Sequence, residues 1–363
     1  MNNVIPEVSA QGAVWWGTYP EAGLGTPTGV GEGLWRQTAD DARLALELPA
    51  PSFLVSHPER PLLYAVSETD SSEVHAIDVS DPEHPRVAAT VRTEGASGCH
   101  LLLSADSRVL YVSHYMSGDL AVVLLGEDGL PTLDEPAQMF GHEGSGPRED
   151  RQEASHAHFA GFGPGGHHVL VADLGTDELR RYAIKDGGLL EDHGIAATLP
   201  PGSGPRHFVV RGEWIYVVCE LDHRLRALRW DAASGTAEVV FDIASTTAPQ
   251  RTGDDVNDSH VVLADDDTLL VGVRGPDVIS VIDLSPEGEP RYRGCFDAGH
   301  WPRHFAVVGD RLHVGAERGH EVRTFALADA LALEPEPEVG HIAELPYVTA
   351  PLPSPACVVA DPN

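Results

Sequence analysis

A short motif recurs along this chain, and its recurrence limits the possible folds more than any other feature. In each copy, one or two histidines, in some copies preceded by arginine or proline, stand directly before a short apolar run. Self-similarity at a spacing of this size is typical of repeat architectures. The copies are Gly98–Leu101, Arg151–Phe159, Gly204–Phe208, Asp258–Val261 and Trp301–Phe305.

The residues that follow each copy predict short β-strands. The apolar runs are rich in Val, Leu and Tyr and are bounded by Asp, Gly, Pro and Ser, which is the pattern of many short strands. Residues 51–58, 61–68, 73–78 and 86–91 predict a meander of four strands. Helical turns, such as one at 329–333, are expected to be minor. The first three strands recur at 99–104, 109–114 and 119–124; 158–163, 168–173 and 178–183; 206–210, 214–220 and 224–230; 259–263, 268–274 and 278–283; and 303–308, 311–316 and 321–326.

The two ends of the chain supply a seventh unit. Residues 353–359 resemble a first strand, and 14–19, 33–37 and 43–48 supply the other three. We therefore expect an all-β fold: a single domain over 1–363 that forms a seven-bladed β-propeller of four-stranded antiparallel blades. Joining the terminal strands in one blade would close the ring and leave no open edge. The expected blades are about 51–97, 98–155, 156–203, 204–257, 258–300, 301–350, and 351–363 together with 1–50.

The alignment of the strand starts places seven residues at equivalent positions. They are separated by 44 to 58 residues, at or above the spacing of about 40–50 residues for propeller blades. The equivalent residues are Phe53, His100, His158, His207, His260, His304 and Cys357.

Charge and cysteine content limit the partners and the compartment. The net charge is −32, from 56 acidic and 24 basic residues, which disfavours a nucleic-acid partner. An anionic substrate would need a local cluster of Arg and His. The four cysteines lie far apart and indicate a reduced, intracellular protein. We see no signal peptide and no apolar run near the roughly 20 residues of a membrane helix, so we expect a cytoplasmic protein without a membrane partner.

Strand geometry brings polar side chains to one end of the central channel. The start of a blade's first strand and the end of its antiparallel second strand lie on the same face of the disc. First-strand starts supply His100, His156, His158, Arg206, His207, His260, Arg303 and His304. Second-strand ends supply Glu68, Tyr115, Leu174, Glu220, Arg274 and Glu317.

Other interpretations of these residues stay open. A repeated histidine can hydrogen-bond to the neighbouring blade, and Glu220 can merely neutralise the arginines. His156 and His158, two apart on a strand, could also contribute to a metal site. No nucleophile elbow or helical zinc motif is present.

Several motifs, in order along the chain, carry a resemblance to a known family. They are Gly17–Tyr19, Gly144–Pro147, Arg151–Glu153 with His156-x-His158, Asp173–Gly175, Gly204–His207, Glu220-Leu221, Arg274-Gly275 and Pro302-Arg303. The chain resembles the seven-bladed propeller lactonases, which include propeller-type 6-phosphogluconolactonases and fungal 3-carboxy-cis,cis-muconate lactonising enzymes. Cys219 and Val273 replace asparagines common in that family.

The resemblance implies a catalytic set of His156 or His158, Arg206, Glu220 and Arg274. We expect further substrate contacts from Gln152, His100, His207, His260, Arg303 and His304. The expected function is hydrolysis of a lactone of an anionic sugar acid, without metal or cofactor, by a monomer or weak homo-oligomer. The alternatives are a carboxymuconate-type lactonising cycloisomerase and a non-catalytic propeller that binds a ligand or a protein.

Overall fold

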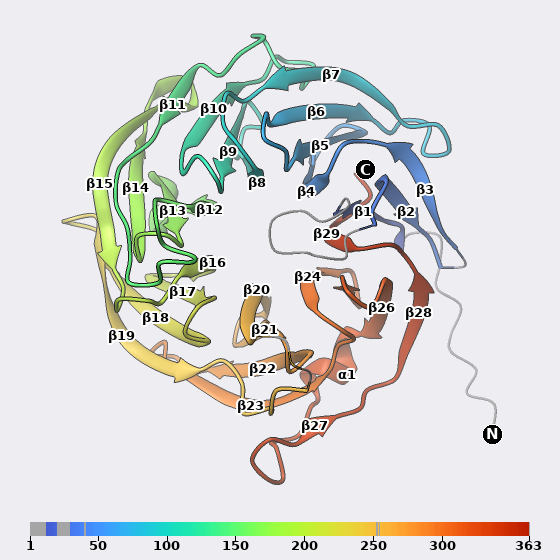
Figure 1. The fold of residues 1–363 in the computed structure, drawn as a ribbon, viewed down its shortest axis with the longest axis vertical. Coiled ribbons are helices and arrows are strands. Elements are labelled where there is room, and N and C mark those ends of the chain that lie inside the picture. The colour runs from blue at the N-terminus through green and yellow to red at the C-terminus, as the bar shows by residue number, and fades with distance from the viewer. Residues whose placement is uncertain (1–11, 20–29, 40, 252, 254, 363) are drawn as a thin grey trace.

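Seven β-sheets surround a central channel in the computed structural model of this protein (Figure 1). The structure describes residues 12–19, 30–39, 41–251, 253 and 255–362. Each sheet is a blade whose first strand lies nearest the axis and whose last strand lies outermost. The predicted seven-bladed, all-β propeller is therefore confirmed.

Six blades follow one another along the chain, and their first three strands lie where the sequence predicts. The fourth strands, which the repeat signal located only in the first unit, complete each sheet. Blade 1 contains β4 (Pro51–Ser56), β5 (Leu62–Ser67), β6 (Glu73–Asp78) and β7 (Arg86–Arg92). Blade 2 contains β8 (Gly98–Leu103), β9 (Val109–His114), β10 (Leu120–Leu124) and β11 (Gln138–Phe140). Blade 3 contains β12 (Ala157–Phe162), β13 (His168–Asp173), β14 (Glu178–Ile184) and β15 (Leu190–Thr198).

The other half of the ring repeats this order. Short 3-10 turns at Pro164–Gly166 and Asp186–Gly188 connect strands of blade 3. Blade 4 contains β16 (Pro205–Arg211), β17 (Trp214–Cys219), β18 (Arg224–Asp231) and β19 (Thr236–Ala244). Blade 5 contains β20 (Asn257–Asp265), β21 (Thr268–Arg274), β22 (Val278–Leu284) and β23 (Pro290–Asp297). Blade 6 contains β24 (Pro302–Val308), β25 (Arg311–Ala316), β26 (Glu321–Ala326) and β28 (Tyr347–Pro351).

Blade 7 joins the two ends of the chain, as predicted. Its strands are β29 (Pro355–Ala360), β1 (Val14–Thr18), β2 (Gly33–Gln37) and β3 (Ala42–Glu47). β29 and β1 pair antiparallel, with Val14 opposite Ala360. Trp15 and Trp16 of β1 are fully buried, and the Trp15 indole Nε1 donates to Asp361 Oδ1 at 2.8 Å. The ring is thus sealed by backbone pairing and by two large apolar side chains.

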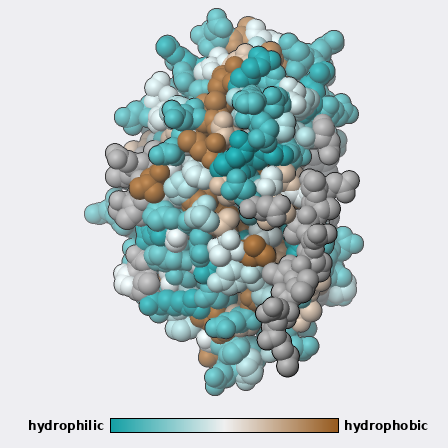
Figure 2. Space-filling model, turned by 90° about the vertical axis from the view of Figure 1, so that its right-hand side faces the viewer, coloured by the Kyte–Doolittle hydropathy of each residue, from teal (hydrophilic) through white to brown (hydrophobic). Residues whose placement is uncertain are grey.

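Apolar side chains between neighbouring blades form the core. The middle strands are flanked by a blade on each side, so both of their faces are buried and they form nearly continuous apolar runs; β5 is buried at all six positions. One cluster joins Leu179 of blade 3 to Phe208 and Val217 of blade 4, and comparable clusters join the other blades. The rim seen in Figure 2 is mostly hydrophilic, with separate hydrophobic patches, as the strong negative charge requires.

A β-bulge at the start of the first strand corrects one predicted alignment. In blades 2 and 4 the ladder skips one residue, between Gly98 and His100 and between Pro205 and His207. In blade 3 the skipped residue is His158 itself. His158 is therefore equivalent to Arg206, and Phe159 to His207, so the predicted alignment was wrong by one residue in this blade. Two residues oppose one across a bulge, which residue spacing alone does not reveal.

Two further elements depart from the repeat. Helix α1 (Leu327–Leu331) forms beside the expected helical turn, two residues earlier than predicted. β27 (Ile342–Ala343) pairs parallel with β23 and makes blade 5 five-stranded, although the sequence assigned 301–350 to the next blade. In the part of the chain that the structure describes, no helix has the length and apolarity that crossing a membrane requires.

Candidate active site at the channel mouth

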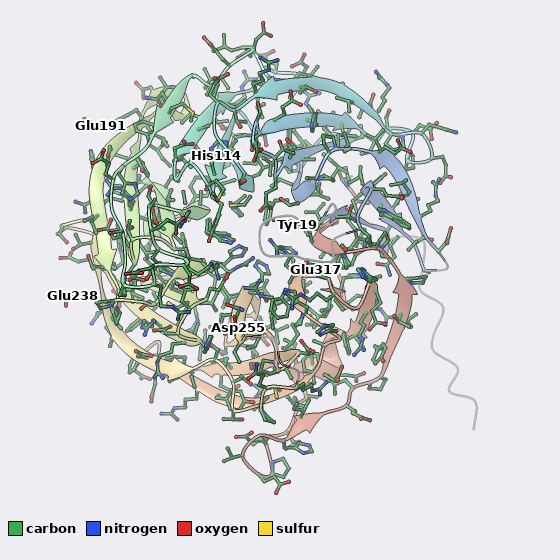
Figure 3. All side chains as sticks on the ribbon, in the orientation of Figure 1. Tyr19, His114, Glu191, Glu238, Asp255 and Glu317 are labelled. Carbon is green, nitrogen blue, oxygen red and sulfur yellow. The ribbon has the colours of Figure 1, made fainter. Side chains whose placement is uncertain are left out.

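Two tiers of side chains meet at one mouth of the channel. One tier consists of bulge residues such as Cys99, His158, Arg206 and Arg303. The other consists of residues that directly follow the second strands. Together they line a cavity of about 530 Å³. In Figure 3, Tyr19, Asp255 and Glu317 lie near the axis, whereas Glu191 and Glu238 lie at the periphery. The lining residues used below are Glu68, Cys99, Tyr115, Arg151, Glu153, His156, His158, Arg206, Glu220, Asp255, Arg274, Trp301, Arg303 and Arg318.

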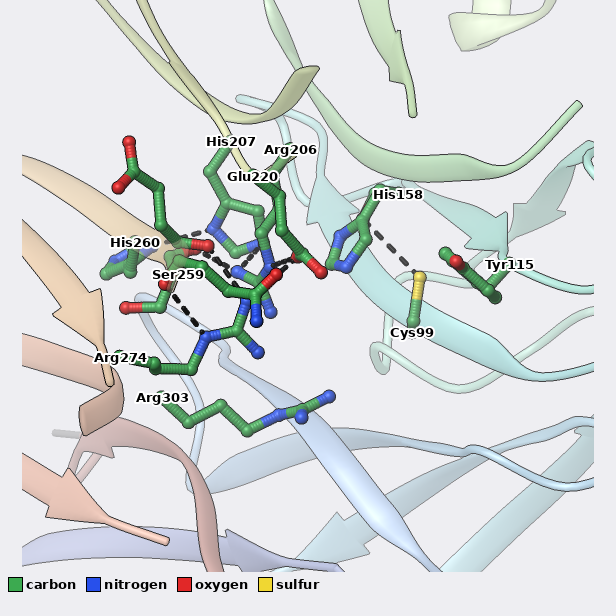
Figure 4. A network of polar contacts seen from close by, with 12 residues as sticks. Cys99, Tyr115, His158, Arg206, His207, Glu220, Ser259, His260, Arg274 and Arg303 are labelled. Atoms are coloured by element: carbon green, nitrogen blue, oxygen red, sulfur yellow. Dashed lines mark hydrogen bonds and ion pairs between the residues drawn. The ribbon is translucent and has the colours of Figure 1, made fainter. Parts of the chain in front are cut away.

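Glu220 is the centre of the charged cluster in this cavity (Figure 4). Its Oε2 contacts Arg206 Nε at 2.8 Å and Arg274 Nη2 at 2.9 Å, and its Oε1 contacts Arg151 Nη2 at 2.7 Å. Burial opposes ionisation of this carboxyl, but the three guanidinium groups outweigh it and hold its pKa well below the usual range. Glu220 is therefore a fixed negative charge and a weak base.

The backbone of blade 5 orients the two buried arginines. Arg206 Nη1 donates to the Ser259 carbonyl, and Arg274 Nη2 donates to the Asp258 carbonyl at 2.9 Å. Burial and the neighbouring Arg274 lower the pKa of Arg206 to about 9, so the guanidinium stays charged at neutral pH. Both groups are thus held at the cavity wall and remain cationic.

His156 and His158 both line the cavity but lie in different surroundings. The His156 ring stacks on Tyr115, its Nδ1 lies 2.7 Å from the Tyr115 carbonyl oxygen and its Nε2 lies 3.3 Å from Glu153. The Nδ1 of His158 is buried and has no hydrogen-bond partner among the described residues. Burial, reinforced by Arg206, keeps the pKa of His158 well below its usual value. A neutral imidazole with a nitrogen available to accept a proton is the stronger candidate for a base.

A second charged group closes the opposite side of the mouth. Arg303 Nη1 lies 3.2 Å from Glu317 Oε2, and the guanidinium lies 4.5 Å from the centre of the Tyr19 ring. The Tyr19 hydroxyl donates to Glu68 Oε1. Burial raises the pKa of Glu68, although Arg303 and the nearby Ser52 hydroxyl oppose the shift.

The repeated histidines form a layer beneath the cavity and do not line it. His100 Nδ1 accepts the Ala160 N–H and His304 Nδ1 accepts the Val358 N–H, each at 3.2 Å. His207 and His260 join through their Nδ1 atoms at 2.7 Å. For His100 and His304, hydrogen bonding to the next blade is therefore the observed arrangement. The expectation that these four histidines contact substrate is not supported by this placement, because the first-strand bulge turns the preceding residue toward the mouth.

Gln152 also lies away from the cavity. Its amide Nε2 donates to the Leu174 carbonyl at 2.9 Å and to Asp177 Oδ1 at 2.7 Å. Asp173 Oδ1 accepts the backbone N–H groups of His156 and Gly175, both at 2.9 Å. These two motifs hold the loop that carries Arg151 and His156, so Gln152 positions the site and is not placed to bind substrate.

The sequence analysis did not assign some of the cavity residues to the site. It also left open whether the histidines hold a metal ion. Arg151 stood in a quoted motif at the end of a long polar loop, but nothing in the strand pattern linked it to Glu220. Trp301 begins one copy of the repeated motif but was not assigned to the site, and Arg318 carried no repeat signal. For the metal alternative, the described residues contain no group of three His, Cys, Asp or Glu side chains arranged to hold a metal ion. Glu220 contacts both Arg206 and Arg274, so these three predicted residues lie together in one cavity.

Comparison with known proteins agrees with this architecture. A 6-phosphogluconolactonase of Bacillus subtilis (strain 168) is 29% identical over 335 residues, which cover 89% of this chain and 90% of that protein. A periplasmic gluconolactonase of Pseudomonas aeruginosa superposes with a TM-score of 0.79 at 24% identity, covering 97% of this chain and 99% of that one. A protein of Lactobacillus plantarum gives 0.79 at 22% identity, over 96% and 98% of the two chains. The model of the family described as "Lactonase, 7-bladed beta-propeller" matches residues 17–358, and this chain belongs to that family.

Proposed function

We propose that this protein hydrolyses a lactone whose acid carries a second anionic group, with 6-phosphogluconolactone as the leading candidate. The observation that carries the proposal is the cluster of Arg151, Arg206 and Arg274 around Glu220 in one cavity. The name of the Bacillus subtilis relative supports the same substrate.

Charge distribution favours an anionic substrate. The whole chain carries −32, yet three buried arginines, Arg206, Arg274 and Arg303, lie at this mouth together with the partly exposed Arg151. Their carboxylate contacts are Glu220 and Glu317. A surplus of positive charge at a buried position requires an anionic partner or costs folding free energy. A phosphate or carboxylate group accepts paired hydrogen bonds from a guanidinium, which fixes the substrate's orientation.

Acidic side chains at the outer edge of the cavity add selectivity for the substrate. Glu153 and Asp255 line the outer part of the cavity, above the arginines. A hydroxyl-rich chain can hydrogen-bond to such carboxylates while its anionic end reaches the guanidinium groups. An arginine that does not hold the phosphate can stabilise the oxyanion that forms as water adds to the lactone carbonyl.

The test is acid release by the purified protein from a panel of lactones, corrected for spontaneous hydrolysis. We expect 6-phosphogluconolactone to exceed glucono-δ-lactone in kcat/KM by at least about 100-fold, because a desolvated charge-assisted contact contributes about 3 kcal/mol. Arg274→Ala should remove most of that preference. Arg211→Ala, which breaks an exposed pair with Asp267 at 2.6 Å, is the matched control. The absence of turnover above the spontaneous rate for every lactone would refute the proposal.

A further inference from the structure

A small hollow lies directly beneath the floor of the main cavity. Its volume is about 10 Å³, and its lining includes Ser52, Glu68, His158 and Ala356. It shares Glu68, Cys99, His158, Arg206 and Arg303 with the larger cavity above it. Figure 4 shows Cys99, His158, Arg206 and Arg303 around this part of the channel. A molecule in the hollow would therefore lie next to one bound in the main cavity.

Three buried polar atoms on residues that line this hollow make no hydrogen bond of standard geometry within the described protein, although the Ser52 hydroxyl also acts on the Glu68 carboxyl. They are Ser52 Oγ, Glu68 Oε2 and His158 Nδ1, and each atom is buried. Ser52 is 5% exposed and His158 is 7% exposed. One buried polar group without a partner costs about 1–3 kcal/mol. Because Ser52 and Glu68 partly satisfy each other, His158 Nδ1 is the atom with the greatest need of a partner in the hollow.

The size and polarity of the hollow fit one water molecule. About 10–15 Å³ of this kind of volume is enough for one water, provided that two to four polar partners surround it. The three atoms offer that number, and Arg303 and Arg206 complete a polar wall. The histidine layer beneath, with His207 and His304 at the hollow, closes it from below.

We propose that this hollow holds the hydrolytic water, with His158 Nδ1 as its base and with Ser52 and Glu68 as the groups that position it. The proposal rests on the proposed lactone hydrolysis and names the site of its second substrate. The water oxygen forms a bond to the lactone carbonyl carbon as one of its protons passes to His158 Nδ1. The carbonyl π electrons move to the oxygen, which faces the arginines.

Collapse of the tetrahedral intermediate breaks the bond from the carbonyl carbon to the ring oxygen. The departing oxygen takes the proton from His158, which regenerates the neutral imidazole. The product is the open hydroxy acid, so atoms and charge balance with water as the only co-reactant. Glu220 is the weaker candidate for the base because both of its carboxylate oxygens already contact guanidinium groups, whereas His158 Nδ1 has no partner in the described protein.

A crystal structure of the wild-type protein tests the site without any assay of activity. The expected result is ordered water density in the hollow, within hydrogen-bond distance of His158 Nδ1 and of at least one of Ser52 Oγ and Glu68 Oε2. A dry hollow, or side chains that collapse to fill it, overturns the proposal.

Two variants test the catalytic role. Ala356→Val adds two methyl groups to the hollow and changes no titratable group, so kcat should fall by at least about 100-fold with KM changed less than about threefold. Ala360→Val, the same substitution at an exposed position of β29, is the control. Ser52→Ala removes one water contact and leaves the volume nearly unchanged. It should lower kcat about tenfold at constant KM, which keeps a test available if the Ala356 variant does not fold.

The outcomes separate the two proposals. If the wild type hydrolyses a lactone and both variants keep full kcat, only the water site is refuted. If the wild type hydrolyses no lactone, the proposed function fails and the hydrolytic role fails with it, whatever the density in the hollow.

Discussion

Replacing Glu220 with Gln removes one charge from a cluster that contains three guanidinium groups. Arg206 and Arg274 are 3% and 5% exposed, so neither can rehydrate without moving. Each ion pair, at a charge separation of about 4 Å and an effective dielectric constant near 20, contributes roughly 4 kcal/mol of attraction. In the variant, relaxation of the neighbouring side chains and partial hydration of the arginines recover most of this energy. Breaking a buried pair by removing one partner typically costs about 3–5 kcal/mol, and we expect a loss of unfolding free energy in this range.

The assay is chemical denaturation of wild type and Glu220→Gln at pH 7, with and without phosphate. Because the three arginines lose their common anion, phosphate should bind the variant and restore part of its stability, while wild type should respond much less. Asp267→Asn breaks an exposed pair and should cost less than about 1 kcal/mol. A Glu220→Gln protein within 0.5 kcal/mol of wild type, or one indifferent to phosphate, would refute the view that this carboxylate neutralises the cluster.

Three further predictions follow from the same site. Because burial keeps His158 neutral, kcat/KM should stay level as the pH falls from 8 through 6.5, and an acid limb at or above pH 6.5 in the pH–rate profile would contradict this. Burial raises the pKa of Asp258 to about 8, so the stability that its proton provides is complete below pH 4 and is lost as the pH rises through 8. Asp258→Asn should therefore gain roughly 2 kcal/mol or more over wild type at pH 9 and little at pH 4, measured by thermal unfolding; an equal difference at both pH values would contradict this. A Cβ on Gly175 would lie 1.8 Å from the Ala154 carbonyl oxygen and 2.9 Å from the His156 ring, so Gly175→Ala should lower kcat/KM at least about tenfold. Gly141→Ala, in the loop between β11 and β12, meets only an ordinary 3.7 Å contact and should not change kcat/KM.

The sequence was informative about the fold because the same physical requirement recurs in every blade. The apolar second and third strands must pack between two neighbouring sheets, so their patterns are strong, and β9, β13, β21 and β25 lie where predicted. The outer strands face solvent on one side, so Gln138–Phe140 and Tyr347–Pro351 carry little pattern. β27 pairs with the sheet of blade 5, although the chain between them has already formed three strands of blade 6. No local sequence pattern indicates such a contact.

The site was predictable where it depends on strand ends and less so where it depends on local register. Arg274 ends a second strand and Glu220 directly follows one, so counting along the repeat located both. The bulge in blade 3 makes His158 the inward-facing residue. Equivalent bulges in blades 2 and 6 place His100 and His304 one residue later, in the layer beneath the cavity. Arg151 reaches Glu220 from a loop, and the conformation of a loop is not determined by strand periodicity.

The closure of blade 7 has a consequence for the biosynthesis of this protein. Trp15 and its partner Asp361 are 346 residues apart, which at 5–20 residues per second means that β1 waits about 20–70 s on the ribosome for β29. During that time blades 1 to 6 can form only an open arc. The apolar flanks that blade 7 later covers, including Leu63 of blade 1 and Val322 of blade 6, stay uncovered. The ring therefore cannot close before β29 has been synthesised, and this interval is when the nascent protein is most open to aggregation and to chaperone binding.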